Sequence, residues 1–190
     1  PREAEFSLRH GSGRWSDAPP SPADLAVPKS LRPPLDRPVA ALGLRSTAPH
    51  EATAALERHF SSAFSYSLVQ EAGRSGADPL EEFLERTKAG HCEHFATATA
   101  LLLRSVGVPA RYATGFAVLE YSRLERAWVV RRRHAHAWTQ AFVDGVWTDL
   151  DTTPDGWPGL EAEEVPPWQP AADLGAWLRR QGRRALREDS

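Results

Sequence analysis

The chain contains a single cysteine, Cys92, preceded by Gly90 and His91. Apolar residues recur at helical spacing from 95 to 106, and the stripe extends back onto the cysteine. We therefore predict a helix that begins at or just before Cys92. The unpaired N–H groups and positive dipole end of a helix start favour a thiolate, which is the nucleophilic form of cysteine. A buried structural cysteine would suit the same stripe, so this pattern alone leaves both interpretations open.

A predicted β-hairpin contains two further groups that could assist a thiol. Asp144-Gly145 is a two-residue turn signal between segments 126–143 and 146–150, which are rich in aromatic and β-branched residues. If these two residues form the loop, Val143 pairs with Val146 (143 + 146 = 289), and all cross-strand partners sum to 289.

This register brings an imidazole and a carboxylate together. Trp138 faces Asp151, and His136 becomes the diagonal neighbour of Asp151, with about 7 to 8 Å between the backbones. Asp149 is the poorer partner because it pairs with Gln140, four residues from His136. The register therefore predicts that Asp151 orients His136.

The two faces of the strand around His136 differ in size. The odd-numbered face holds only small residues, and the even-numbered face holds His134, His136, Trp138, Gln140 and Phe142. We expect the even-numbered face to lie toward the start of the cysteine helix. Thiol, imidazole and carboxylate would then align as nucleophile, base and orienting group.

Three separated motifs resemble the bacterial transglutaminase-like core: GHCEHFATATALLLRSVGVPARYATGF, HAHAW and WTDLDTTP. The resemblance covers about residues 50 to 157. It implies that Cys92 is the nucleophile, His136 the base and Asp151 the orienting group. The usual DPT of the family is DTT here, which keeps the carboxylate. Eukaryotic members use calcium and an upstream tryptophan, but no calcium loop is visible, and the nearest upstream tryptophan, Trp15, is too remote to correspond.

The resemblance also implies an α+β, papain-like fold, with the catalytic cysteine at a helix N-terminus packed on an antiparallel β-sheet. The order of elements favours the same class, because predicted helices at 51–64 and 78–87 precede the cysteine helix and extended segments follow it. The resemblance further implies that the domain belongs to a larger membrane-anchored bacterial protein and lies outside the cytoplasm; the alternative is a cytoplasmic location.

We predict three regions. Residues 1–49 are rich in proline and form an irregular wrap, with one short strand at 3–9. Residues 50–157 form the catalytic core. Residues 158–190 form a tail with a basic helix at about 171–187.

Further site residues are predicted around this triad. The backbone N–H of Cys92 is the natural first oxyanion donor, and the resemblance suggests Tyr66 as a second. His94 would make a polar contact near the site mouth, while Trp138 and Trp147 could line a substrate groove or belong to the core.

No metal or cofactor is expected. The histidines near the cysteine lack the HxxxH or CxxC spacing of zinc sites, although a metal cluster is an alternative; they are His91, His94, His134 and His136. With one cysteine, the chain also has no internal disulfide.

Composition limits the partners. A net charge of −2 gives no overall field for nucleic acid or anionic lipid. No apolar run reaches the roughly 18 residues of a membrane span, and no segment resembles a signal peptide. Because the chain begins at Pro1 and has no methionine, we expect it to be part of a longer protein, which could be membrane-anchored. The predicted partner is a protein or peptide substrate, and the oligomeric state is not predicted.

The expected reaction is thiol-dependent acyl transfer or hydrolysis at a glutamine side chain or peptide amide, through a thioester. A lysine amine as the second nucleophile would make the enzyme a transglutaminase, and water an amidase or peptidase. The alternative is a catalytically silent module of the same fold that binds peptides or cell wall.

Overall fold

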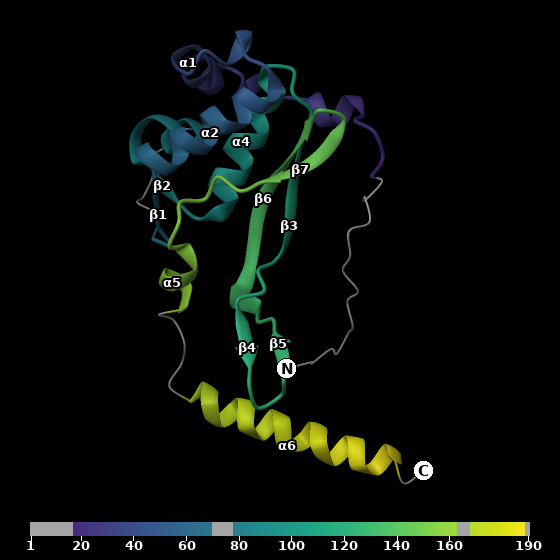
Figure 1. The fold of residues 1–190 in the computed structure, drawn as a ribbon. Coiled ribbons are helices and arrows are strands. Elements are labelled where there is room, and N and C mark those ends of the chain that lie inside the picture. Colours follow the sequence, from purple (N-terminus) through teal and green to yellow (C-terminus); the bar gives the residue numbers. More distant parts are fainter. Residues whose placement is uncertain (1–16, 70–77, 163–167, 189–190) are drawn as a thin grey trace.

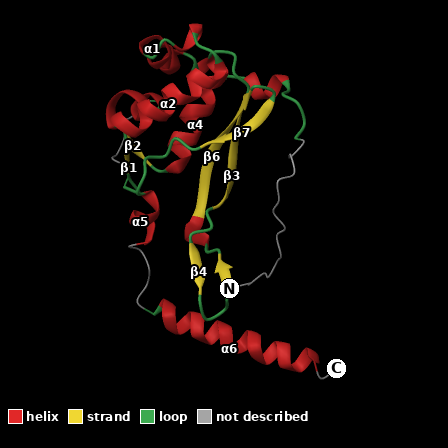
Figure 2. Ribbon diagram, in the orientation of Figure 1, coloured by secondary structure: helices red, strands yellow, loops and turns green. Residues whose placement is uncertain are grey.

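The computed structural model describes residues 17–69, 78–162 and 168–188. The α-helices that precede the strands in the chain lie on one side of a three-stranded antiparallel sheet in the order β3-β6-β7 (Figures 1 and 2). The predicted α+β class is confirmed. The elements before the sheet are η1 (Pro22–Leu25), η2 (Lys29–Leu31), α1 (Pro33–Ala41), η3 (Leu44–Ser46), α2 (Pro49–Ala63), β1 (Ser65–Tyr66), α3 (Pro79–Glu81), η4 (Glu82–Thr87), β2 (Ala89–Gly90) and α4 (Cys92–Ser105).

The strands follow α4. They are β3 (Ala110–Phe116), β4 (Glu120–Ser122), β5 (Ala127–Val129), β6 (Ala135–Val143) and β7 (Val146–Leu150), with a 3-10 turn, η5 (Arg132–His134), before β6. The single extended segment predicted at 126–143 is therefore wrong, because η5 interrupts it. Helices α5 (Trp157–Ala162) and α6 (Gln169–Glu188) come last, and α6 corresponds to the predicted C-terminal helix.

The hairpin register is as predicted. Val143 pairs with Val146 and Thr139 with Leu150, and Asp144 and Gly145 both have positive φ, at 51° and 82°. Two consecutive left-handed residues are what a tight hairpin turn with the twist of its strands requires.

The core is built where α4 crosses the sheet. Phe95, Leu102 and Leu103 of α4 are fully buried, together with Phe60 of α2 and Ala141 of β6. Thr139 Oγ1 on β6 donates to the backbone oxygen of Ala96 on α4 at 2.9 Å, so helix and sheet are also joined by a buried hydrogen bond.

The expectation that residues 1–49 are irregular, with the core starting at about residue 50, is wrong for the described part. Leu35 and Val39 of α1 and Leu44 of η3 are each 1% exposed and belong to the main core. Proline content concealed this helix. Pro33 and Pro34 lie in its first turn, where a proline costs no hydrogen bond, whereas Pro38 lies inside the helix and is buried with Leu35 and Val39. The strand predicted at 3–9 lies outside the described residues.

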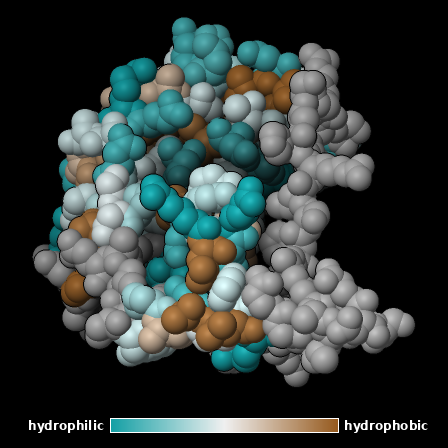
Figure 3. Space-filling model, turned by 60° about the horizontal axis from the view of Figure 1, so that its bottom comes forward, coloured by the Kyte–Doolittle hydropathy of each residue, from teal (hydrophilic) through white to brown (hydrophobic). Residues whose placement is uncertain are grey.

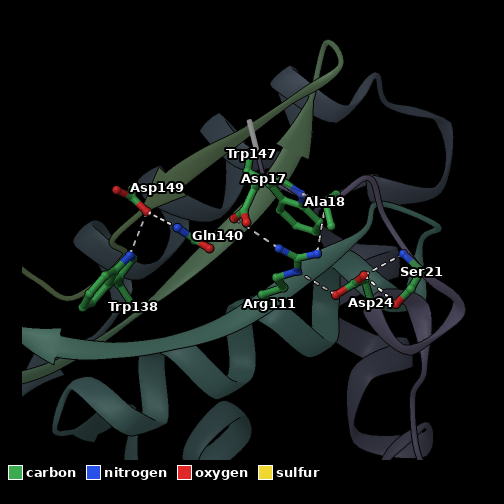
Figure 4. A network of polar contacts seen from close by, with 9 residues as sticks. All are labelled: Asp17, Ala18, Ser21, Asp24, Arg111, Trp138, Gln140, Trp147 and Asp149. Carbon is green, nitrogen blue, oxygen red and sulfur yellow. Dashed lines mark hydrogen bonds and ion pairs between the residues drawn. The ribbon is translucent and has the colours of Figure 1, made fainter. Parts of the chain in front are cut away.

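An arginine on β3 holds the segment before η1 against the sheet (Figure 4). Arg111 pairs with Asp24 at 3.0 Å and Asp17 at 3.3 Å, and its guanidinium lies 3.8 Å from the centre of the Trp147 ring. Trp147 Nε1 in turn donates to the Ala18 oxygen at 2.9 Å. The N-terminal segment is therefore anchored near the turn end of the hairpin.

A second arginine, in the segment just before η5 and His136, is bound to both β4 and α6. Arg131 pairs with Glu120 on β4 at 2.6 Å and with Asp173 on α6 at 2.8 Å. Hydrogen bonds to both carboxylates raise the pKa of Arg131, although burial acts in the opposite direction.

Candidate active site

Cys92 is the first residue of α4 and is 8% exposed, in a cluster with Ala96 and Ala137. Its N–H belongs to the first turn, which has no intrahelical acceptors. The preceding strand β2 pairs in parallel with β1, so that Tyr66 lies opposite Gly90. A Cβ on Gly90 would come within 2.8 Å of His94 Cγ. Glycine thus allows the close packing that sets the start of the cysteine helix.

His136 is held by Asp151. His136 Nε2 lies 2.7 Å from Asp151 Oδ2. A carboxylate only accepts, so Nε2 carries a proton in this contact. The other ring nitrogen, Nδ1, is buried and makes no hydrogen bond of good geometry to a nitrogen or oxygen of the described residues.

The thiol lies beside this ring. Burial alone lowers the pKa of His136, but hydrogen bonding and charge interactions with Asp151 and Cys92 outweigh burial and raise it to about 9. Because Nε2 is bonded to Asp151, Nδ1 is the nitrogen available to the sulfur. The imidazole can therefore take a proton from the thiol on one side while the carboxylate steadies it on the other.

Asp151 is kept charged by its neighbours. Burial raises its pKa, but hydrogen bonds from His136 and from Thr153 lower it below its usual value. Thr153 donates its backbone N–H to Asp151 Oδ1 at 3.0 Å. Thr152, which lies between Asp151 and Thr153, is buried, and its hydroxyl lies 2.7 Å from that of Thr99 on α4. This contact fixes the segment after β7, and with it Asp151, to the cysteine helix.

A tryptophan that the sequence analysis did not identify lies flat on the imidazole. The rings of His136 and Trp157 are 4.1 Å apart and 4° from parallel, and Trp157 is 8% exposed. The signal available in the sequence was its place six residues after Asp151, but a contact between α5 and β6 cannot be read from strand register.

We expect Trp157→Ala to slow alkylation of Cys92 by iodoacetamide at neutral pH by about tenfold. A cation over an indole is stabilised by about 1 to 2 kcal/mol in a desolvated site, so losing the ring disfavours the imidazolium that supports the thiolate. Trp157→Phe, which keeps a ring face, should lose much less. Thermal unfolding checks that all three proteins are folded. Equal alkylation rates in wild type and Trp157→Ala would then contradict a role for the stacking of Trp157 on His136.

The orientation predicted for β6 is wrong. The small odd-numbered residues face α4: Ala137, Thr139 and Ala141 are at most 2% exposed, and Thr139 bonds the helix backbone. Small side chains let a helix approach a sheet closely, whereas the bulky even-numbered residues could not. His136 still interacts with Cys92, from a position next to Ala137 at the end of the strand where α4 begins.

Two of the other predicted residues lie around the triad. Tyr66 lies 6.4 Å from Trp157, ring to ring. Trp138 lies 6.3 Å from His136 and donates to Asp149 at 2.9 Å.

The side chains of His94 and Trp147 lie in other parts of the structure. The ring of His94 packs on His91 and Phe83 and beside Gly90, where it supports the helix start. The expectation that Trp147 lines the site is wrong, because it pairs with Phe142, six residues from His136, and is bound to Ala18 near the turn.

Within the described residues, no group of three or more His, Cys, Asp or Glu side chains is arranged to hold a metal ion. In the same part of the chain, no helix is long and apolar enough to cross a membrane.

The chain is similar to known proteins. The Transglutaminase-like superfamily model matches residues 40–152. A protein-glutamine gamma-glutamyltransferase of Pseudomonas aeruginosa is 35% identical over 107 residues, which are 55% of this chain and 16% of that protein. An uncharacterized Mycobacterium leprae protein is 35% identical over 130 residues, 64% of this chain and 42% of that protein. The chain thus spans less than half the length of these relatives.

A solved structure has the same fold. The periplasmic domain of TgpA from Pseudomonas aeruginosa, bound to ethylmercury, superimposes with a TM-score of 0.64 at 30% identity, over 73% of this chain and 50% of that one. Together with the helix-start cysteine on an antiparallel sheet, these matches establish the α+β, papain-like architecture. The chain belongs to the transglutaminase-like superfamily.

Proposed function

We propose that this domain is a cysteine-dependent enzyme that transfers or hydrolyses acyl groups at glutamine side chains or peptide amides. One observation supports the proposal above all others. The His136 ring is bonded through Nε2 to Asp151 at 2.7 Å, and the next residue on β6, Ala137, packs with Cys92 at the start of α4. Such an arrangement activates a thiol in cysteine acyl-transfer enzymes.

In the proposed reaction, the Cys92 sulfur attacks the amide carbonyl carbon and its proton resides on His136. The tetrahedral intermediate expels nitrogen, which takes that proton and leaves as ammonia or an amine, and a thioester remains. A second nucleophile, an amine or water, gives its proton to His136 and attacks the thioester carbon. The carbon–sulfur bond then breaks and the thiolate is restored.

The oxyanion of each intermediate needs donors. The proposed first donor is the Cys92 N–H, because α4 begins at that residue. Tyr66 is the proposed second, supported by its position opposite Gly90 and near Trp157. Trp138 is proposed to border the acyl group, while the packing of His94 favours a structural role.

We expect a glutamine-containing peptide to yield the amine adduct when incubated with the enzyme and a primary amine, and glutamate when no amine is present. Mass spectrometry distinguishes these products. Glutamate in both reactions would reject cross-linking and favour hydrolysis, and cleavage of the peptide would favour a peptidase. No change in either reaction would favour the silent binding module.

The domain boundaries and location are also proposals. Burial of Leu35, Val39 and Leu44 extends the core toward the N-terminus, so we place the catalytic core from about α1 to α5. Since the matched structure of TgpA is a periplasmic domain, an extracytoplasmic location is proposed, with protein or peptide substrates there.

A further inference from the structure

Strand β3 is an open edge beside the candidate active site. It is the terminal strand in the order β3-β6-β7 among the described residues. Phe142 donates its N–H to Pro109 O at 2.9 Å, and Ala117 donates to His134 O at 2.8 Å. These two bonds at the ends of the β3–β6 pairing identify odd-numbered β3 residues as those that bond inward.

Hydrogen-bonding direction alternates along an antiparallel strand. The N–H and C=O groups of Tyr112, Thr114 and Phe116 therefore point outward, away from β6. Among the described residues, no backbone group pairs with them, so an added strand could extend the sheet by main-chain hydrogen bonds.

The side chains of the same three residues lie on the face of the nucleophile. Thr114 is paired with Ala137, which packs with Cys92, and Tyr112 is paired with Thr139, which bonds α4. Cross-strand partners share a face of the sheet. The exposed side chains along β3 thus lead directly past the thiol.

The aromatic members of this row are open to solvent. Tyr112 is 41% exposed and Phe116 56% exposed. Burial and the charges of Glu93 and Cys92 raise the pKa of Tyr112, in keeping with its place on the same face of the sheet as the thiol. Apolar exposure continues through Val118 and Leu119 to Tyr121 on β4. Figure 3 brings forward the end of the molecule that holds β4, β5 and α6, and hydrophobic patches are visible on it.

We infer that the acyl donor is an extended peptide segment that pairs with the outer edge of β3, with its reactive glutamine opposite Thr114. Residues two positions before and two after the glutamine lie opposite Tyr112 and Phe116, on the same face. Apolar side chains at these two positions pack on the two rings. This inference rests on the proposed function and adds to it a substrate class: extended segments with apolar residues two positions from the glutamine.

The strand that pairs with the edge of β3 is inferred to be the substrate itself, because this edge lies beside the thiol. Backbone pairing would bring a peptide past Cys92 in one fixed register, and the alternation of strand residues would direct the glutamine side chain toward the thiol. Main-chain bonds would provide affinity that depends little on sequence, while Tyr112 and Phe116 would select among segments.

The first test changes the peptide and leaves the protein unaltered. A glutamine peptide with leucine two positions from the glutamine on both sides is compared with analogues N-methylated at single backbone positions. Each methyl removes one donor. Edge pairing predicts that methylation at alternate residues raises KM by about tenfold or more, the effect of one lost hydrogen bond, while the intervening residues tolerate it. The sensitive parity gives the strand direction. Equal effects at both parities, or none, would overturn the inference.

The second test changes the protein. Tyr112→Ala and Phe116→Ala should lower the ratio of kcat/KM for the leucine peptide to that for the same peptide with glycines at both positions. Tyr121→Ala is the matched control, since Tyr121 is 50% exposed but lies on β4. A ratio unchanged in both variants would reject aromatic selection at the edge. If wild type turns over no glutamine peptide at all, the proposed function itself has failed, which is a separate outcome.

Discussion

Cys92→Ala is expected to reduce turnover of glutamine peptides by about 10⁴-fold or more, because the proposed thioester cannot form without the sulfur. The substitution is structurally mild. Cys92 packs with two alanines, Ala96 and Ala137, so a methyl group in place of the thiol leaves the free energy of unfolding within about 1 kcal/mol of wild type.

The measurement is a comparison of wild type, Cys92→Ala and Cys92→Ser under identical conditions, with thermal unfolding of each. The serine variant tests whether a hydroxyl can replace the thiol in the same position. Because Cys92 is the only cysteine, the alanine variant also provides a thiol-free background for alkylation. Undiminished turnover in a folded alanine variant would refute the proposed nucleophile.

The hairpin shows how far sequence reasoning reached. Asp144-Gly145 specifies a two-residue turn, and a turn of known length fixes which residues face each other across the strands. The neighbourhood of His136 and Asp151 follows from this register, and the observed separation of Nε2 and Oδ2 is 2.7 Å. The turn signal was sufficient to predict this contact because His136 and Asp151 are only fifteen residues apart in one hairpin.

Packing between elements was not accessible in the same way. Which face of β6 meets α4 depends on the space the helix requires, and the small residues Ala137, Thr139 and Ala141 provide it. The prediction that the face of His136 meets the helix did not consider the size of the side chains on each face. The contact of Trp157 with His136 likewise depends on where α5 folds back, which no strand periodicity specifies.

The prediction for the N-terminal region was wrong for a different reason. Its prolines argue against regular structure, yet Leu35 and Val39 recur at the four-residue spacing of a helix face and are buried. Apolar periodicity was the better guide there, since Pro33 and Pro34 lie in the first turn, where proline is tolerated, and the helix also contains Pro38 on its buried face.

Asp151→Asn is expected to lower kcat/KM by about 10²- to 10⁴-fold, as loss of the orienting carboxylate does in related triads. The effect should depend on pH. Asp151 helps raise the pKa of His136 to about 9, so in wild type the imidazolium persists until the pH rises through about 9, and activity falls above that. Without the carboxylate charge, the pKa of His136 is lower, and the alkaline decline begins at lower pH.

Asp149→Asn provides the matched control. Asp149 is two residues away, on β7, but it accepts from Trp138 and Gln140, both at 2.9 Å, rather than from His136. Its loss should change kcat/KM only a few-fold and leave the alkaline limb in place. Together the two variants distinguish the effect of losing the charge next to His136 from the effect of losing any nearby carboxylate. An alkaline limb that stays at the same pH in Asp151→Asn would show that His136 is not the group whose proton that limb reports.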